Sequence, residues 1–239
     1  MNGISNPFQA CLHIWFNPKT VFAAVDKHHN WSWIPFFIVM LGVLLPTYAY
    51  FQFVDFDWYR EFYVAFTAGD VSPAEKEAVL VSLRSQSVYM YSNMFAYCLG
   101  YVLLAAIIAG YLNMMTKVDE ENINGFTDWY GFVWWTFLPV FITGVVMLLM
   151  ILIKDDNQTS LYGLQPLSLG YWLGLNETSK WVGLADQFRV ELFLSFYFMI
   201  TGLKQWTRLS ILRIYLILFV PYILIVGSSI FLSFYWASA

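Results

Sequence analysis

The ionisable side chains that lie within long apolar stretches are the residues best suited to carry chemistry in this sequence. They are Arg189, Glu191 and Arg213. Even the lower estimates put the free-energy cost of a charge at the centre of a lipid bilayer at about 2.5 to 3.5 kcal/mol. Such residues therefore pair with another charge, anchor a helix end or line a path for ions or headgroups. Glu191 can pair with Arg189 or Lys180, and Arg213 can extend its long stem toward the interface. An anchoring role and a role in an ion or headgroup path both stay open.

Small side chains form two rows in the apolar stretch that runs from residue 88 to 115. Ala105 pairs with Ala109 and Ala106 with Gly110, each four positions apart. Residues at this spacing lie on one face of a helix, and small side chains there let another backbone approach closely. The rows predict a helix-packing surface, either inside one bundle or at the seam of a homo-oligomer.

The sequence contains no recognisable motif for metal binding, phosphate binding or catalysis. His13, His28 and His29 lack the spacing of a metal site, and the acidic run 119–121 is typical of a solvated loop. No phosphate loop, HExxH motif or paired-cysteine motif occurs. We therefore expect no metal, no cofactor and no enzymatic activity. With a net charge of -4 and no basic run, the chain is also expected to bind no nucleic acid.

Five long apolar stretches must position these residues. They are Trp33 to Phe51, Val88 to Met115, Tyr130 to Ile153, Phe188 to Leu203 and Ile211 to Trp236. A helix needs about 20 apolar residues to cross a bilayer core of about 30 Å. All of the stretches reach that length except Phe188 to Leu203, which is short. The chain is 59% hydrophobic and 12% charged, whereas soluble domains carry about 25% charged residues. The sequence predicts an all-α polytopic membrane helix bundle with five transmembrane helices plus amphipathic interfacial helices.

Two short helices are expected before the first stretch. Asn6-Pro7 and Asn17-Pro18 each place a capping side chain before a proline, which is typical of a helix start. In the first helix the apolar residues fall within one arc, so we expect it to lie flat at the headgroup level. These helices form a predicted N-terminal region, residues 1–32, before a transmembrane domain at 33–239.

Two connecting segments carry further signals. Ser72-Pro73-Ala74-Glu75 has the pattern of a capping box, so a helix is expected to run from Pro73 straight into the second stretch. Lys154 to Gln187 interleaves aromatic residues with glycines, and we expect an interfacial or partly re-entrant segment rather than a sixth crossing. The compact basic turn from Lys204 to Arg213 favours a cytoplasmic N-terminus by the positive-inside rule.

Four elements follow one another along the chain: Phe16 to Phe22 with its Asn-Pro opening, the Ser72 to Glu75 helix start, Leu164 to Leu167, and Ile200 to Leu203 before a basic turn and a final span with Pro221. Their order carries a resemblance to the Yip family (Ypt/Rab-interacting membrane proteins), specifically its bacterial branch. It implies a five-span bundle with a cytoplasmic N-terminus. The acidic-aromatic motif of the eukaryotic relatives has no match, and only a short segment precedes Trp33, so we expect the bacterial inner membrane.

Two functions from different classes follow. The first is a non-enzymatic membrane-organising, membrane-shaping or scaffold protein, whose partners are the lipid bilayer and a second copy or another membrane protein. The second is a transporter or channel for lipids or small solutes, motivated by prolines in the apolar stretches and by Glu191 and Arg213.

Overall fold

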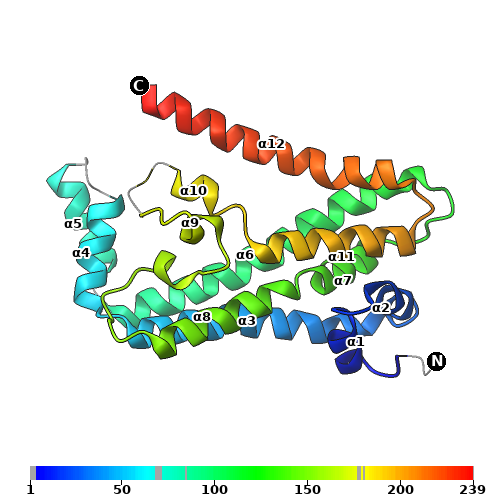
Figure 1. Ribbon diagram of the computed structural model, residues 1–239, viewed down its shortest axis with the longest axis horizontal. Helices are drawn as coiled ribbons and strands as arrows, with labels where there is room; N and C mark the ends of the chain where they lie inside the picture. Colours follow the sequence, from blue (N-terminus) through cyan, green and yellow to red (C-terminus); the bar gives the residue numbers. More distant parts are fainter. Residues whose placement is uncertain (1–3, 68–71, 84, 177–178, 180, 239) are drawn as a thin grey trace. The chain divides into compact units, whose positions relative to one another are not determined.

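The structure is a computed structural model that describes residues 4–67, 72–83, 85–176, 179 and 181–238. These residues form helices joined by turns, and the only pairing of β type among them is an isolated bridge between Ser168 and Arg189. The predicted all-α architecture is confirmed (Figure 1).

Two short helices open the described chain, as predicted. Helix α1 spans Pro7–His13 and helix α2 spans Pro18–Val25. The Asn6 side chain accepts a hydrogen bond from the backbone N–H of Gln9 at 2.9 Å, and Asn17 does the same for Thr20 at 3.3 Å. Each asparagine thus satisfies one of the N–H groups that have no partner within a helix start, while the proline that follows lacks such a group.

Four apolar helical segments are long enough to cross a membrane among the described residues. They lie at 30–53, 86–118, 126–153 and 211–231. Their helices are α3 (Trp33–Phe53, after the 3-10 turn η1, His29–Ser32), α6 (Gln86–Met115, followed by η2, Thr116–Val118), α7 with α8 (Phe126–Thr136 and Pro139–Ile153), and α12 (Ile211–Ser238). The third segment is interrupted at residues 137–138, because Pro139 has no N–H to donate and disfavours helical geometry in the residue before it.

The fourth apolar stretch forms helix α11, Val190–Trp206, which has 17 residues. At about 1.5 Å per residue this helix is roughly 25 Å long, shorter than the bilayer core of about 30 Å. Length and composition therefore give four spans, and the fifth predicted crossing depends on α11.

Helices α4 (Phe56–Thr67) and α5 (Pro73–Ser82) connect α3 to α6. The predicted capping box is confirmed: the Ser72 N–H donates to the Glu75 carboxylate at 2.9 Å, and the Glu75 N–H donates to the Ser72 hydroxyl at 3.4 Å. The prediction of one continuous helix from Pro73 into the second span is wrong. α5 ends before Leu83, and Ser85 accepts from the backbone N–H groups of α6, which makes it a new helix start.

The segment after α8 contains only short helices in its described part. They are η3 (Tyr162–Leu164), α9 (Leu169–Trp172) and α10 (Val182–Ala185). Each has four residues or fewer, which is far too short to cross a bilayer.

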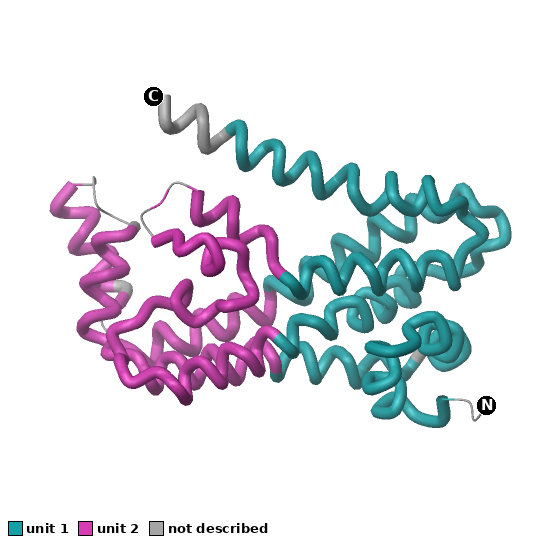
Figure 2. Tube along the Cα trace, viewed as in Figure 1, with its two compact units in different colours: residues 1–41, 100–142, 190–239 teal, residues 42–99, 143–189 magenta. Residues whose placement is uncertain are grey.

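The chain divides into two compact units (Figure 2). Unit 1 comprises residues 1–41, 100–142 and 190–239, and unit 2 comprises residues 42–99 and 143–189. In unit 1, α2 packs on α11, and the Trp206 indole donates to the Phe22 carbonyl at 2.9 Å. In unit 2, an aromatic core gathers around Tyr50, Phe51 and Tyr59 at the end of α3 and in α4.

Candidate functional site

Helix α1 is apolar on two faces, which is the most distinctive surface feature of unit 1. Ala10, Cys11 and Ile14 are buried, with exposed fractions of 0%, 7% and 0%. Burial raises the pKa of the Cys11 thiol to about 12, so this side chain behaves as a core residue. The buried face explains how α1 is held in the fold.

The opposite surface of this segment carries large apolar side chains without cover. Phe8, Leu12 and Phe16 are 64%, 70% and 90% exposed, and we call these three residues the outer face of α1. Since water penalises exposed apolar area by roughly 25 cal/mol per Å², such a face is typical of a helix that lies in the membrane interface. Trp33 and Phe37 at the start of α3 are also exposed, at 63% and 60%.

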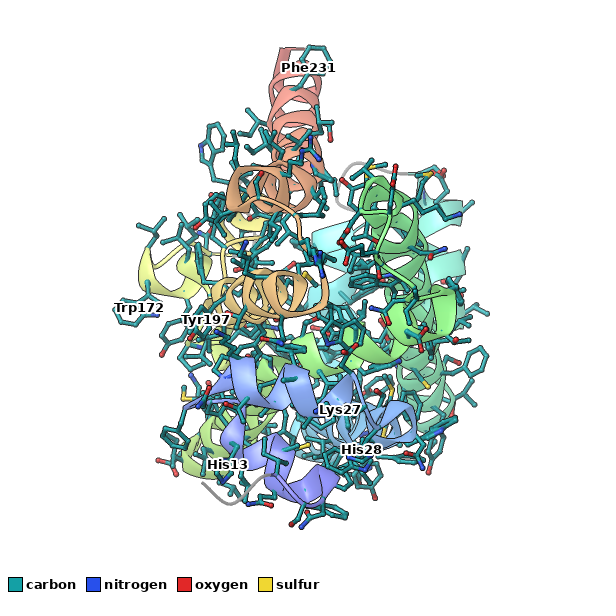
Figure 3. The ribbon with its side chains drawn as sticks, turned by 90° about the vertical axis from the view of Figure 1, so that its right-hand side faces the viewer. His13, Lys27, His28, Trp172, Tyr197 and Phe231 are labelled. Atoms are coloured by element: carbon teal, nitrogen blue, oxygen red, sulfur yellow. The ribbon has the colours of Figure 1, made fainter. Side chains whose placement is uncertain are left out.

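Polar side chains border the N-terminal helices. His13, Lys27 and His28 project from this part of unit 1 in Figure 3, and all three are exposed. The His28 ring stacks on Trp31 with 4.4 Å between ring centroids. Among the described residues, no group of three or more His, Cys, Asp or Glu side chains is arranged to hold a metal ion.

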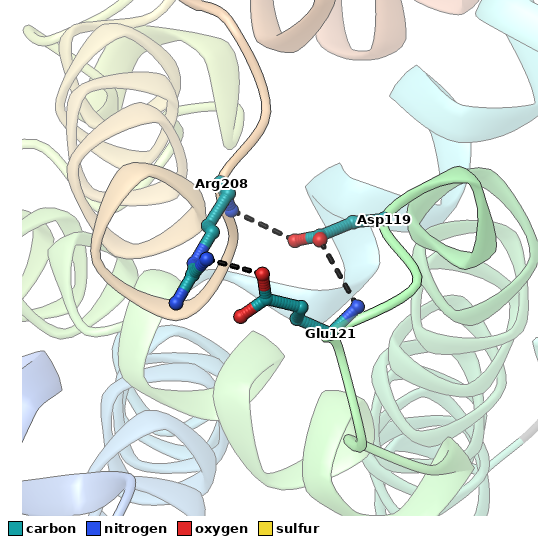
Figure 4. Close-up of polar contacts among 3 residues, drawn as sticks. All are labelled: Asp119, Glu121 and Arg208. Carbon is teal, nitrogen blue, oxygen red and sulfur yellow. Dashed lines mark hydrogen bonds and ion pairs between the residues drawn. The ribbon is translucent and has the colours of Figure 1, made fainter.

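Two loops of unit 1 meet in a small polar cluster (Figure 4). The Arg208 backbone N–H donates to the Asp119 carboxylate at 2.7 Å, and its guanidinium forms an ion pair with Glu121. Asp119 also accepts from the Glu121 N–H at 3.3 Å. The side chains of the ion pair are 74% and 59% exposed, so the pair itself contributes little stability. The cluster's structural effect is to join the loop after α6 to the loop after α11.

The predicted ionisable residues lie at helix ends. Glu191 is in the first turn of α11, where the positive end of the helix dipole favours an acid, and Arg213 is in the first turn of α12, exposed. Glu191 lies at the start of α11, whereas Arg213 lies beyond the other end of α11, in the helix that follows it within unit 1. The structure does not bring these two residues together.

Arg189 belongs to unit 2 and is half-buried. Its Nε–H donates to the Asp186 backbone carbonyl at 2.8 Å, which closes the turn before α11. Lys180, the other suggested partner of Glu191, lies outside the described residues.

The small-residue rows of α6 divide between two environments. Ala105 and Ala109 are fully buried, while Ala106 and Gly110 are half-buried. A Cβ built on Gly110 would meet only the Phe126 ring, at 3.9 Å, which is an ordinary contact. The first row therefore packs within the chain, and the second still has room on its surface.

The closest helix approach lies elsewhere, in unit 2, and sequence reasoning missed it. A Cβ on Gly144 of α8 would lie 1.9 Å from the backbone carbonyl oxygen of Gly42 in α3. Only residues without side chains permit such an approach. Both glycines were visible in apolar stretches, but their facing positions depend on the register of two helices that are distant in sequence.

A model of the Yip1 domain matches residues 12–233. Neither a curated protein nor a solved structure matches the chain. The family match extends from the end of α1 into α12 and thus includes the membrane-length helices described above. The chain therefore belongs to the Yip1 domain family and is an integral membrane protein.

Proposed function

We propose that this protein is a non-enzymatic membrane-shaping scaffold that inserts the outer face of α1 into one leaflet. The observation that carries the proposal is the two-faced apolar character of this segment. Ala10 and Ile14 hold it against unit 1, while Phe8, Leu12 and Phe16 remain uncovered. A rigidly held wedge at headgroup depth expands one leaflet relative to the other, and an interfacial helix of this kind is sensitive to curvature.

The proposal requires α1 to act on a defined side of the membrane, and contacts in unit 1 support this. Asp119 and Arg208 join the loop after α6 to the loop after α11. Trp206 at the end of α11 donates to Phe22 of α2, so the N-terminal helices lie beside the same helix end. These contacts favour one face for the N-terminus and for both loops.

Contacts in unit 2 join the ends of α3 and α8 and the start of α6 to one another. The Asp55 N–H after α3 donates to the Asn157 carbonyl after α8 at 3.1 Å, and the Gln86 side chain at the start of α6 donates to the Phe51 carbonyl. We propose a five-span scheme for the chain. In this scheme α11 crosses despite its length, and the basic turn from Lys204 to Arg213 supports a cytoplasmic N-terminus.

The proposed location is a bacterial inner membrane, and the proposed domain arrangement is an N-terminal interfacial region at 1–32 before a five-span domain at 33–239. The bilayer is the first partner. A second copy or another membrane protein is the second, and the half-buried row of Ala106 and Gly110 has room for it.

The experiment is reconstitution of the purified full chain into large liposomes, followed by cryo-electron microscopy of vesicle shape. We expect tubulated or smaller vesicles with the wild type and far fewer with the combined Phe8→Ser, Leu12→Ser and Phe16→Ser variant. The matched control is His13→Ser with Lys19→Ser, which changes exposed polar residues in the same region. Vesicles of unaltered shape with the wild type would contradict the proposal.

The second candidate is a transporter or channel for lipids or small solutes. The break between α7 and α8 favours it, since discontinuous helices line substrate sites in many transporters. Glu191 lies in the first turn of α11 and Arg213 in the first turn of α12, and this separation weighs against a shared mid-membrane site. Flux through proteoliposomes that is lost in Glu191→Gln or Arg213→Leu would favour this candidate over the scaffold.

A further inference from the structure

A small cavity lies entirely within unit 2, in the segment between α8 and α11. Its volume is about 230 Å³, and its lining includes Tyr162, Gly163, Gly170, Tyr171 and Asp186. We call it the 162–186 pocket. It is smaller than the 300–1,000 Å³ or so of pockets that hold drug-sized ligands, so it fits a group of a few heavy atoms.

The chemistry of the pocket centres on the carboxylate of Asp186. Its Oδ2 atom is buried, and no hydrogen-bond donor from the described residues reaches it. Its Oδ1 atom would lie 2.5 Å from a Cβ on Gly170, so the absence of a side chain there makes room for the carboxylate. Buried carboxylate oxygens are costly unless they accept hydrogen bonds, so this oxygen calls for a donor other than the described residues.

The nearest described cation does not fill this role through its Nε atom. The Arg189 Nε–H donates to the backbone carbonyl of Asp186 rather than to its carboxylate. Among the described residues, the pocket lining contains one carboxylate, whereas Ca²⁺ takes six to eight oxygen ligands and Mg²⁺ demands a near-octahedral set. A single carboxylate beside two tyrosine rings suits an organic cation better, because aromatic faces attract ammonium groups.

The surroundings of the pocket indicate where such a cation comes from. Trp172 and Leu173 follow the pocket residue Tyr171 directly and are 76% and 60% exposed. The Trp172 side chain projects outward in Figure 3, and its indole donates to the Pro166 carbonyl at 2.6 Å. Tryptophan and tyrosine gather at the headgroup level of membranes, which favours a position for the pocket beside lipid headgroups that carry ammonium groups.

We propose that the 162–186 pocket binds the primary ammonium group of an ethanolamine-type phospholipid. The three N–H donors of that group supply what Asp186 lacks, and the rings of Tyr162 and Tyr171 face its charge. A choline headgroup carries the same charge without a donor, and a glycerol headgroup carries no cation. This inference goes beyond the membrane-shaping role and is independent of α1.

The test measures lipid retention by native mass spectrometry on the delipidated full chain, offered phosphatidylethanolamine, phosphatidylcholine and phosphatidylglycerol in equal amounts. We expect the wild type to bind phosphatidylethanolamine about tenfold or more tightly than either other lipid, the range expected for a charge-assisted hydrogen bond. This selectivity does not depend on any variant being folded. Asp186→Asn should bind the three lipids equally, whereas the matched control Asp155→Asn, which changes an exposed acid in unit 2, should keep the preference.

Any of three outcomes would overturn the inference. The first is equal binding of the three lipids by the wild type. The second is a lipid preference that Asp186→Asn retains while its thermal unfolding matches the wild type. The third is tight binding of soluble phosphorylethanolamine without any preference among the lipids, which would reject the lipid as the source of the ammonium group.

Discussion

Replacement of Gly144 by alanine tests the packing of α3 against α8. The new Cβ would lie 1.9 Å from the Gly42 carbonyl oxygen, 2.7 Å from its carbonyl carbon and 3.0 Å from its Cα, whereas ordinary contact begins at 3.4 Å. The shortfall at the oxygen is 3.4 minus 1.9, or 1.5 Å. Because the obstacle is backbone, no side-chain rotation can relieve it, and the helices must move apart.

The expected cost follows from this shift. Overpacking of a well-packed core costs about 1 to 3 kcal/mol and occasionally more, and a backbone obstacle puts Gly144→Ala at the upper end of that range. For a chain of this size 1 kcal/mol corresponds to roughly 2–4 °C in Tm, so we expect a loss of about 6–12 °C. The assay is thermal unfolding of the detergent-solubilised full chain, followed by tryptophan fluorescence at one heating rate.

Gly100→Ala on α6 is the matched control. A Cβ there meets nothing within 4 Å, so the same substitution should leave Tm unchanged or raise it slightly through helix propensity. If Gly144→Ala and Gly100→Ala melt at the same temperature, the close approach of α3 and α8 is refuted.

The remaining predictions concern unit 1. Gly202→Ala would bring a Cβ to 2.3 Å from the Phe132 ring; because a ring can shift where a backbone cannot, we expect a Tm loss of about half that of the α8 glycine variant or less in the same melt. The raised pKa of Cys11 predicts that the folded protein gains no thiolate at pH 8, so a water-soluble maleimide should label this thiol only after unfolding in detergent; rapid labelling of the native protein would contradict its burial. The same shift predicts a pH dependence with a definite sign: the unfolded thiol ionises near pH 9 and the folded one near pH 12, so the stability due to the neutral thiol is complete below pH 9 and falls as the pH rises toward 12, a decline that Cys11→Ala should remove in chemical denaturation. Asp119→Ala removes the acceptor of two backbone N–H groups and should lower Tm more than Glu121→Ala, which breaks an exposed ion pair worth about 1 kcal/mol or less; equal effects would show that the loop contact does not matter.

Local signals in the sequence were sufficient to predict three helix starts. Asn6, Asn17 and Ser72 were each predicted to cap a helix, and each side chain accepts the expected backbone hydrogen bond. Such caps depend on residues within one turn, so no knowledge of the fold is needed. Apolar length likewise identified the membrane helices, because the bilayer fixes how many residues a crossing needs.

Features that depend on distant contacts were not predictable in this way. The break between α5 and α6 leaves Leu83 fully buried among the aromatic residues of unit 2, which a continuous helix from the capping box did not anticipate. The Gly42 and Gly144 contact and the environment of Asp186 depend on which residues of separate segments face one another. A single sequence reports periodicity and length, but it does not report the register between helices.

The measurement that tests the central claim most directly is the membrane depth of the outer face of α1. A spin label is attached at Phe16→Cys in a chain whose Cys11 and Cys98 are replaced by alanine. Electron paramagnetic resonance in proteoliposomes then measures how accessible the label is to oxygen, which concentrates in lipid, and to a water-soluble nickel complex. A reference label at Ile107, which is 69% exposed on α6, gives the values expected in lipid. A second reference label at the exposed Lys27 gives the values expected in water. The account predicts that position 16 is accessible to oxygen and shielded from nickel, like position 107. A label as accessible to nickel as the one at position 27 would contradict it.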